Sequence, residues 1–192
     1  TFPSVDDIKS RVSFKNVKGV YDRGKTKHNK IEAKAIVDEI FTRLSNPKQQ
    51  HQSIGVVTFN QVQQTLIEDM IDERLKEDSS LEKYFTDEVL DPVFVKNLEN
   101  VQGDERDVIL FSVGYGPDET GHMTLNFGPL NRDGGWRRLN VAVSRAKKEM
   151  IIYASMEPDQ INLSRTKAEG VHSLRAFMEF AKRGNEPLLL EN

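Results

Sequence analysis

The chain has 192 residues, of which 37% are hydrophobic and 30% are charged, and this composition is typical of a globular domain. It contains no cysteine, which excludes a disulfide scaffold and a thiolate metal site. With 27 basic and 30 acidic side chains the net charge is −3, which argues against attraction of nucleic acid to the whole surface but leaves room for a local basic groove.

The N-terminal stretch TFPSVDDIKS has neither the basic start nor the apolar run of a secretory signal. No apolar run in the chain reaches the length of a membrane span. We therefore expect a cytoplasmic protein with no membrane partner. The sequence does not begin with Met, and we expect it to be a piece of a larger protein.

In the first half of the chain, apolar runs alternate with amphipathic ones. Residues 12–17 and 54–59 are short apolar runs, as expected of strands, and the second is rich in β-branched residues. Residues 29–44 and 60–77 repeat their apolar side chains at a spacing of three and four, which predicts helices. The first helix should begin at Asn29, because an Asn at the N-cap followed three residues later by a Glu is a capping-box pattern.

The second half continues the alternation. We expect strands at residues 93–99, 107–115 and 149–155, and helices at 137–148 and 171–184. Strands that alternate with helices of this length favour right-handed crossovers and a mainly parallel sheet. The sequence therefore predicts an α/β fold, a doubly wound sheet with helices on both faces.

Two segments interrupt this rhythm. Residues 116–135 are rich in Gly, Pro, Asn and Asp and form a long insertion, in which we expect a short strand at 123–127. Residues 157–170 are expected to be a loop. We predict one domain over residues 1–184, and a tail or linker over residues 185–192.

The stretch GVYDRGKT, residues 19–26, matches the pattern of a nucleotide-binding phosphate loop. In such a loop the helix begins at the Lys-Ser/Thr pair, so that its positive dipole end faces the anion. Here the predicted helix begins only at Asn29, and the variable positions hold bulky side chains and the negatively charged Asp22. No later apolar strand ends in the acidic residue that such enzymes use to hold Mg²⁺.

We therefore interpret GVYDRGKT as a polar loop between a strand and a capped helix. The alternative is a self-contained small NTPase or nucleotide kinase that uses Gly24, Lys25 and Thr26.

Four stretches in a fixed order carry a family resemblance. They are NKIEA (29–33), IGVVTFNQVQQ (54–64), VQGDERDVILFSVGYG (101–116) and RRLNVAVSRAKKEMIIYAS (137–155). Together they resemble the second, C-terminal RecA-like domain of superfamily 1 helicases, in the branch that contains the RNA helicase of nonsense-mediated decay and its bacterial relatives. The last two stretches are the most specific, because both motifs occur at the order and spacing of the family.

The resemblance implies a shared ATP site. ATP with Mg²⁺ would be held by an N-terminal RecA-like domain of the same polypeptide, and this domain would lack a working phosphate loop of its own. Arg145 matches the arginine finger of the family, and Lys30 falls where the family places a second γ-phosphate arginine. Gln102, Gly103 and Glu105 match the motif beside the nucleotide, where Glu105 would accept a hydrogen bond from the ribose.

The resemblance also implies a groove for single-stranded DNA or RNA. Thr58 and Asn60, at the end of a predicted strand, match positions that face the nucleic acid in this family. Asn97 and Glu99 match a segment that links the nucleic-acid groove to the ATP cleft. Hydroxyl and amide groups suit phosphate oxygens without a net positive surface.

Without the family context these residues have plainer interpretations. Arg145 and Arg138 would share a solvated face of the predicted helix 137–148, and Glu105 would be a surface acid. The four histidines are scattered, with no ligand spacing, so we predict no metal site in this chain. A third possible function is a non-catalytic RecA-like module that binds a protein or single-stranded nucleic acid.

Overall fold

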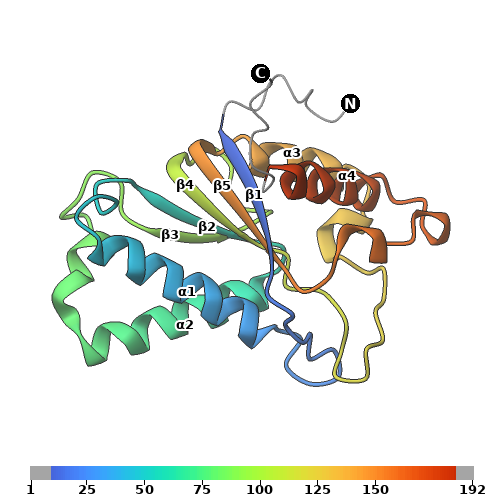
Figure 1. Ribbon diagram of the computed structural model, residues 1–192, viewed down its shortest axis with the longest axis horizontal. Helices are drawn as coiled ribbons and strands as arrows, with labels where there is room; N and C mark the ends of the chain where they lie inside the picture. Colours follow the sequence, from blue (N-terminus) through green and yellow to red (C-terminus); the bar gives the residue numbers. More distant parts are fainter. Residues whose placement is uncertain (1–9, 185–192) are drawn as a thin grey trace, which may run out of the picture.

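The computed structural model describes residues 10–184, and the predicted tail at 185–192 lies outside them. Five strands form one sheet in the order β1-β5-β4-β2-β3, and every neighbouring pair is parallel (Figure 1). The strands are β1 (Arg11–Asn16), β2 (Ile54–Thr58), β3 (Phe94–Asn97), β4 (Arg106–Ser112) and β5 (Ala146–Ala154). The predicted α/β fold with a parallel sheet is confirmed.

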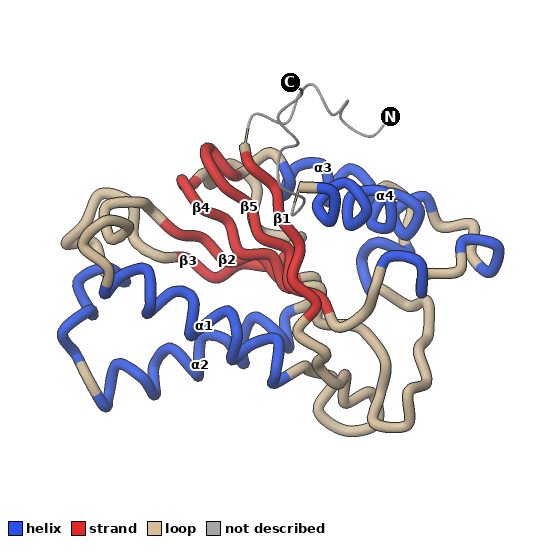
Figure 2. Tube along the Cα trace, viewed as in Figure 1, coloured by secondary structure: helices blue, strands red, loops and turns tan. Residues whose placement is uncertain are grey.

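Four α-helices cover the sheet on both faces (Figure 2). Helices α1 (Lys30–Ser45) and α2 (Gln61–Glu77) lie on one face, and α3 (Gly135–Val143) and α4 (Glu169–Arg183) lie on the other. Short 3-10 helices complete the described elements: η2 (Ser79–Phe85), η3 (Gly128–Asn131), η4 (Pro158–Gln160) and η5 (Leu163–Arg165). The sheet is therefore doubly wound, as predicted.

The strands are buried because both faces of the sheet are covered. All five residues of β2 are buried, as are the last five residues of β4 and of β5. A strand buried on both faces has to be apolar throughout rather than alternating, and this explains the continuous apolar runs in the sequence. One hydrophobic cluster fills the space under α1 and α2, and the other fills the space under α3 and α4.

Because all strands are parallel, the sheet has two different edges. We call the edge where the strands begin the amino edge, and the edge where they end the carboxyl edge. The strands end at Asn16, Thr58, Asn97, Ser112 and Ala154. Loops that leave the carboxyl edge include residues 17–29 and the long insertion after β4, which run beside each other in Figure 1.

The predicted helix at 137–148 is too long. Helix α3 ends at Val143, and Ser144 and Arg145 form a turn before β5 begins at Ala146. The reason is sheet pairing: residues from Ala146 onward pair with β4, starting from Arg106, so they cannot continue the helix. Arg145 is therefore a turn residue and does not share a helix face with Arg138.

The short strand predicted at 123–127 is absent from the described insertion. The backbone there bonds to a side chain instead of to a neighbouring strand. Asn131 accepts a hydrogen bond from the amide of Phe127 at 2.7 Å and donates one to the carbonyl of Leu125 at 2.8 Å. Phe127 is fully buried, so the apolar residues of this segment fill the core from a loop.

Candidate functional site

Arg145 lies at the amino edge, in the turn between α3 and β5. Its backbone carbonyl accepts a hydrogen bond from the amide of Arg106 at 3.1 Å, which places it beside the first residue of β4. Its half-buried side chain is held by local acceptors, with Nε 3.1 Å from the carbonyl of Val141 and Nη2 2.9 Å from Ser144 Oγ. Within residues 10–184 no carboxylate forms an ion pair with this guanidinium, so its charge is not neutralised inside the domain.

Gln102, Gly103 and Glu105 belong to the segment that crosses from the end of β3 to the start of β4. Gly103 has φ of 88°, a left-handed conformation that favours glycine, and a Cβ there would have no neighbour within 4 Å. Gln102 and Glu105 are exposed. The next residue, Arg106, donates from Nη1 to the backbone carbonyl of Glu105 at 2.8 Å and from Nη2 to the carbonyl of Pro92 at 3.0 Å, so it leaves the Glu105 carboxylate unpaired. Glu105 is thereby left on the same edge as Arg145.

Lys30 lies at the other edge of the sheet. It is the first residue of α1, which starts above the carboxyl ends of the strands, whereas Arg145 precedes the first residue of β5. β5 has nine residues, and a strand of that length spans about 30 Å at about 3.3 Å per residue. The structure therefore places Arg145 close to the segment between β3 and β4 that contains Glu105. Lys30 is close neither to Arg145 nor to that segment.

The four residues predicted to face nucleic acid all lie at the carboxyl edge. Thr58 is fully buried, and its hydroxyl donates to the carbonyl of Asn60 at 2.8 Å. The Asn60 side chain caps α2 by accepting from the amide of residue 63 at 2.7 Å. Asn97 is buried and donates to Gln64 Oε1 at 2.9 Å, while Glu99 is exposed and lies 3.5 Å from an arginine of the insertion. Of the four, Glu99 is the most open to solvent.

Glu32 forms a buried network that the sequence reasoning missed. The capping box it was predicted to complete is only half present: Asn29 accepts from the amide of Glu32 at 3.1 Å, but the Glu32 carboxylate points into the protein. It accepts from Ser112 Oγ at 2.8 Å, from the Gly114 amide at 2.7 Å and from Ser155 Oγ at 2.8 Å. The network thus ties the start of α1 to the ends of β4 and β5.

In a capping box the Glu32 side chain would accept a hydrogen bond from the backbone amide of Asn29, and here the Gln63 side chain does so instead. It accepts from the amide of Asn29 and donates to the carbonyl of Asn29, both at 2.9 Å, which joins the starts of α1 and α2.

Burial raises the pKa of Glu32 to about 7, although the hydrogen bonds from Gly114 and the serines oppose this rise. The sequence signal was present in Ser112 and Ser155, polar residues at the ends of two otherwise apolar strands.

The loop GVYDRGKT does not have the geometry of a phosphate loop. Helix α1 begins at Lys30, five residues after Lys25, so its amide groups are remote from the Lys-Thr pair. The Asp22 carboxylate fills the interior of the turn, where it accepts from the amide of Thr26 at 3.2 Å and from its hydroxyl at 2.7 Å. These are donors that a phosphate loop would offer to the nucleotide.

Comparison with known proteins identifies the family. A family model described as an AAA domain matches residues 3–157, which is most of the chain. The family consists of C-terminal RecA-like domains of superfamily 1 helicases from the nonsense-mediated-decay branch. The chain belongs to this family.

Two curated relatives of this helicase domain come from mycoplasmas. The uncharacterized ATP-dependent helicase MG140 of Mycoplasma genitalium is 36% identical over 143 residues, which cover 72% of this chain and 12% of that protein. Its homolog in Mycoplasma pneumoniae is 37% identical over 139 residues, which cover 70% and 12%. The chain thus spans about an eighth of the length of these relatives.

One solved structure that matches is the C-terminal domain of a possible DNA helicase from Lactobacillus plantarum. The match has 14% identity and a TM-score of 0.41, and covers 65% of this chain and 67% of that one. A likeness at this level carries no argument about function.

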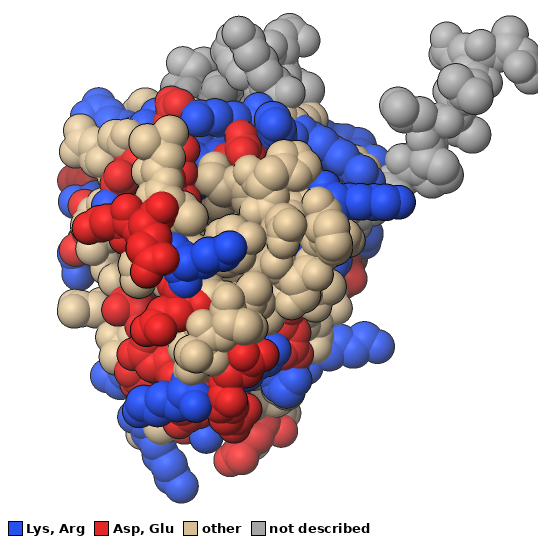
Figure 3. Space-filling view, turned by 90° about the vertical axis from the view of Figure 1, so that its left-hand side faces the viewer, with Lys and Arg blue, Asp and Glu red and all other residues tan. Residues whose placement is uncertain are grey.

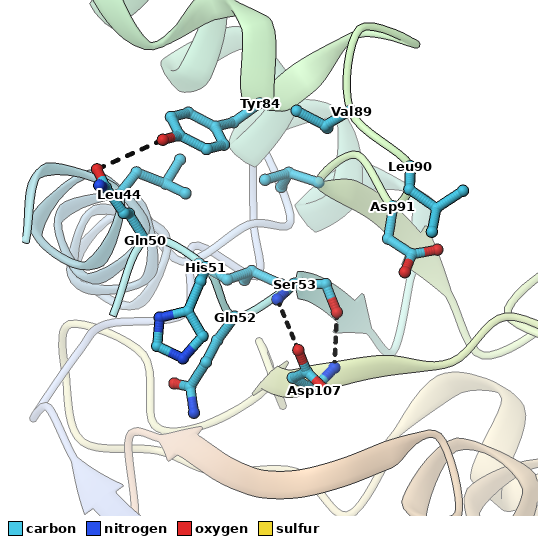
Figure 4. A pocket seen from close by; sticks show the side chains of 12 residues that line it. Leu44, Gln50, His51, Gln52, Ser53, Tyr84, Val89, Leu90, Asp91 and Asp107 are labelled. Carbon is cyan, nitrogen blue, oxygen red and sulfur yellow. Dashed lines mark hydrogen bonds between the residues drawn. The ribbon is translucent and has the colours of Figure 1, made fainter. Parts of the chain in front are cut away.

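The helicase domain also has a cavity of about 330 Å³ at its amino edge (Figure 4). Ser53 and Asp107 close one side by exchanging hydrogen bonds of 3.0 and 2.9 Å, and the Tyr84 hydroxyl reaches Gln50 on the other side at 3.4 Å. Leu90 at its rim is 95% exposed. None of the predicted site residues lines this cavity, so it is separate from both groups of residues described above.

Figure 3 shows the amino-edge end of the helicase domain from outside, with Lys and Arg side chains along its upper rim. The α3–β5 segment alone supplies five basic residues, at positions 137, 138, 145, 147 and 148.

Between residues 10 and 184, no group of three or more His, Asp or Glu is placed to hold a metal ion. In the same range, no helix combines the length and the apolar character needed to cross a membrane.

Proposed function

We propose that this domain completes an ATP site whose phosphate-binding half lies in an N-terminal RecA-like domain of the same polypeptide. Arg145 is the arginine finger of this site. The observation that carries the proposal is that its guanidinium is partly exposed, is held by neutral acceptors only, and lies beside the start of β4. Since no carboxylate of residues 10–184 forms an ion pair with Arg145, its positive charge is left free to neutralise a charge outside the domain.

The residues around Arg145 fit a nucleotide. Ser144 and the carbonyl of Val141 orient the guanidinium, so less side-chain freedom has to be lost when it meets a phosphate. Gly103 leaves open space for a close approach of the backbone, Gln102 lies next to it, and the exposed carboxylate of Glu105 is positioned to accept a hydrogen bond from a ribose hydroxyl. ATP, when bound with Mg²⁺ on the partner domain, would supply the phosphoryl group and the driving energy for movement.

At the carboxyl edge we propose a groove for single-stranded DNA or RNA. Glu99 and the loop around Asn60 would line it, and the buried side chains of Thr58 and Asn97 would hold the backbone that faces it. Lys30 starts α1 at this same edge, across the sheet from Arg145, so we do not assign it to the γ-phosphate that Arg145 would contact. Closing and opening of the ATP site at one edge would then move the groove at the other.

The small NTPase that uses Gly24, Lys25 and Thr26 is not favoured. Its phosphate would have to displace the Asp22 carboxylate from the turn, and the helix start lies too far along the chain to help.

The proposal is tested by Arg145→Ala in the full-length protein, with the exposed Arg165→Ala as a matched control. Because a finger acts on charge that develops in the transition state, we expect kcat for ATP hydrolysis to fall by roughly 10³- to 10⁵-fold. The affinity for ATP should change by only a few fold. Unchanged turnover in Arg145→Ala, or an equal loss in Arg165→Ala, would remove Arg145 from the mechanism.

A further inference from the structure

The loop that leaves the carboxyl end of β1 is strongly basic, although the domain as a whole is acidic. Between residues 18 and 30 it carries five basic side chains and a single acidic one, Asp22. The basic residues are Lys18, Arg23, Lys25, Lys27 and Lys30. We call residues 17–30 the basic loop, and its local charge contrasts with the net charge of −3 for the whole chain.

The lysines of the basic loop form no ion pairs within the described part of the domain. All four lysines are exposed, and within residues 10–184 none of their ammonium groups forms an ion pair. Arg23 is the exception, with a contact of 3.4 Å to Asp118 of the insertion. The charges are therefore available to a partner that the domain does not contain.

Two of these lysines have an unusual backbone. Lys18 has φ of 53° and Lys27 has φ of 59°, and they are the two non-glycine residues of the described chain with positive φ. A lysine in this conformation is strained, and a glycine or asparagine would be the ordinary choice. Strained residues that are retained in a structure tend to occur at functional sites.

The basic loop is also firmly anchored. The amide of Tyr21 donates to the carbonyl of Pro117 at 3.0 Å, and the Tyr21 ring packs edge-on against Tyr115 at 5.3 Å between centroids. Gly19 lies so close to the Glu32 network that a Cβ there would be 2.4 Å from Asn29 Oδ1 and 2.6 Å from Ser155 Oγ. The loop therefore presents its lysines from a fixed base.

The inside of the loop is closed to an anion. The Asp22 carboxylate already accepts from Thr26, and the amide of Lys27 donates to the carbonyl of Asp22 at 2.7 Å. A phosphate can therefore be met only from outside the turn, by the exposed lysine side chains. Lysines spread along residues 18–30 suit several separate phosphates better than the clustered phosphates of one nucleotide.

From these observations we propose that the basic loop binds the phosphate backbone of a nucleic-acid strand, with Lys25 and Lys27 on successive phosphates. The loop adjoins the proposed groove, because Asn29 is bonded to Gln63 and Asn60 caps the same helix. Lysine is a point charge on a flexible stem, so it adds affinity without selecting a base sequence. The inference rests on the proposed function for the presence of a strand in the groove.

The test is the salt dependence of binding of a fluorescent single-stranded oligonucleotide of mixed sequence, as DNA and as RNA, to the full-length protein. The variant Lys25→Gln/Lys27→Gln removes two charges and keeps similar side chains, so the strained backbone is left as it is. Lys48→Gln/Lys76→Gln is the control, since both of these lysines are exposed and lie outside the basic loop. Thermal melting checks that both variants fold.

We expect the loop variant to bind several-fold more weakly for every sequence. Its slope of log K against log salt should become shallower by about 0.7 for each phosphate that a lysine no longer neutralises. The control should keep the slope of the unsubstituted protein. An unchanged slope in the loop variant, with normal binding by the unsubstituted protein, would overturn this inference and leave the proposed function intact. If the unsubstituted protein binds neither oligonucleotide, the groove itself fails and the inference fails with it.

A last outcome concerns the nucleotide. If the loop variant loses affinity for ATP while its binding of the oligonucleotide is unchanged, the basic loop is a nucleotide site and the inference is wrong.

Discussion

Among the individual residues, Glu32 is unusual because its buried carboxylate is surrounded by hydrogen-bond donors that carry no charge. Its two oxygens accept from two serine hydroxyls, one backbone amide and the amide group of Asn29, at 2.7 to 3.3 Å. Two of these donors cannot accept a proton in return, so the site is built for the ionised carboxylate. Burial opposes ionisation, and no charged side chain is among the main causes of the pKa shift.

This balance predicts a pH dependence of stability. The pKa of Glu32 is raised from 4.5 to about 7 in the folded domain, so between these values the folded state holds a proton that the unfolded state has lost. The free energy of unfolding should therefore fall as pH rises through this window, by about 3.5 kcal/mol in total at about 1.4 kcal/mol per pKa unit. Glu32→Gln should abolish this part of the slope.

The measurement is denaturant unfolding of both proteins between pH 4.5 and pH 8. The difference between their free energies should depend on pH, because only the protein with Glu32 titrates in this window. Glu32→Gln also changes the hydrogen bonding of this site, which adds an offset between the two curves. Two parallel curves would mean that Glu32 does not titrate in this window.

The strained backbone of Lys27 gives a second prediction at this scale. Lys27→Gly should relieve the strain of the left-handed conformation at φ of 59°. Glycine loses more chain entropy on folding, which offsets part of this gain, so we expect a net stabilisation of up to about 1 kcal/mol. Thermal melting measures this. If Lys27→Gly lowers the melting temperature, the loop is not strained at this position.

Individual site residues differed in how well the sequence predicted them. Arg145 and Glu105 were predicted as site residues from motifs, and the structure places both at the amino edge, where their proposed roles stay predictions. The sequence did not predict that the Glu32 side chain points into the protein, because an Asn-x-x-Glu pattern is equally compatible with a capping box on the surface. What decides between the two is Gln63, a residue 31 positions further along the chain that bonds to Asn29.

At the scale of elements, the alternation of apolar and amphipathic runs predicted every strand of the sheet and its four α-helices. It works because a strand covered on both faces must be apolar throughout, whereas a covering helix needs only one apolar side. The boundaries depend on tertiary contacts, and there the prediction was weaker. The end of α3 at Val143 is set by the pairing of Ala146 with Arg106, a partner 40 residues earlier in the chain.

The insertion illustrates the same limit. Leu125 and Phe127 are apolar enough for a strand, but the Asn131 side chain satisfies their backbone groups, so no pairing partner is needed. A local side-chain interaction of this kind leaves no periodic signal in the sequence.

In the molecule as a whole, the parallel sheet separates two sets of residues for which we propose functions. The amino edge carries Arg145 and Glu105, and the carboxyl edge carries the basic loop and the residues of the proposed groove. A parallel sheet makes this separation unavoidable, because strand starts and strand ends lie at opposite edges. If the proposed function holds, small movements of the rigid domain about the ATP site would be transmitted to a strand bound at the other edge.

The measurement that most directly tests the central claim is ATP hydrolysis by the isolated chain compared with the full-length protein. We predict turnover by the full-length protein and none above background by the chain alone, because Arg145 would act on a nucleotide held by the N-terminal domain. Robust turnover by the isolated chain that disappears in Lys25→Gln would contradict it, since GVYDRGKT would then be a working phosphate loop and the domain a complete enzyme.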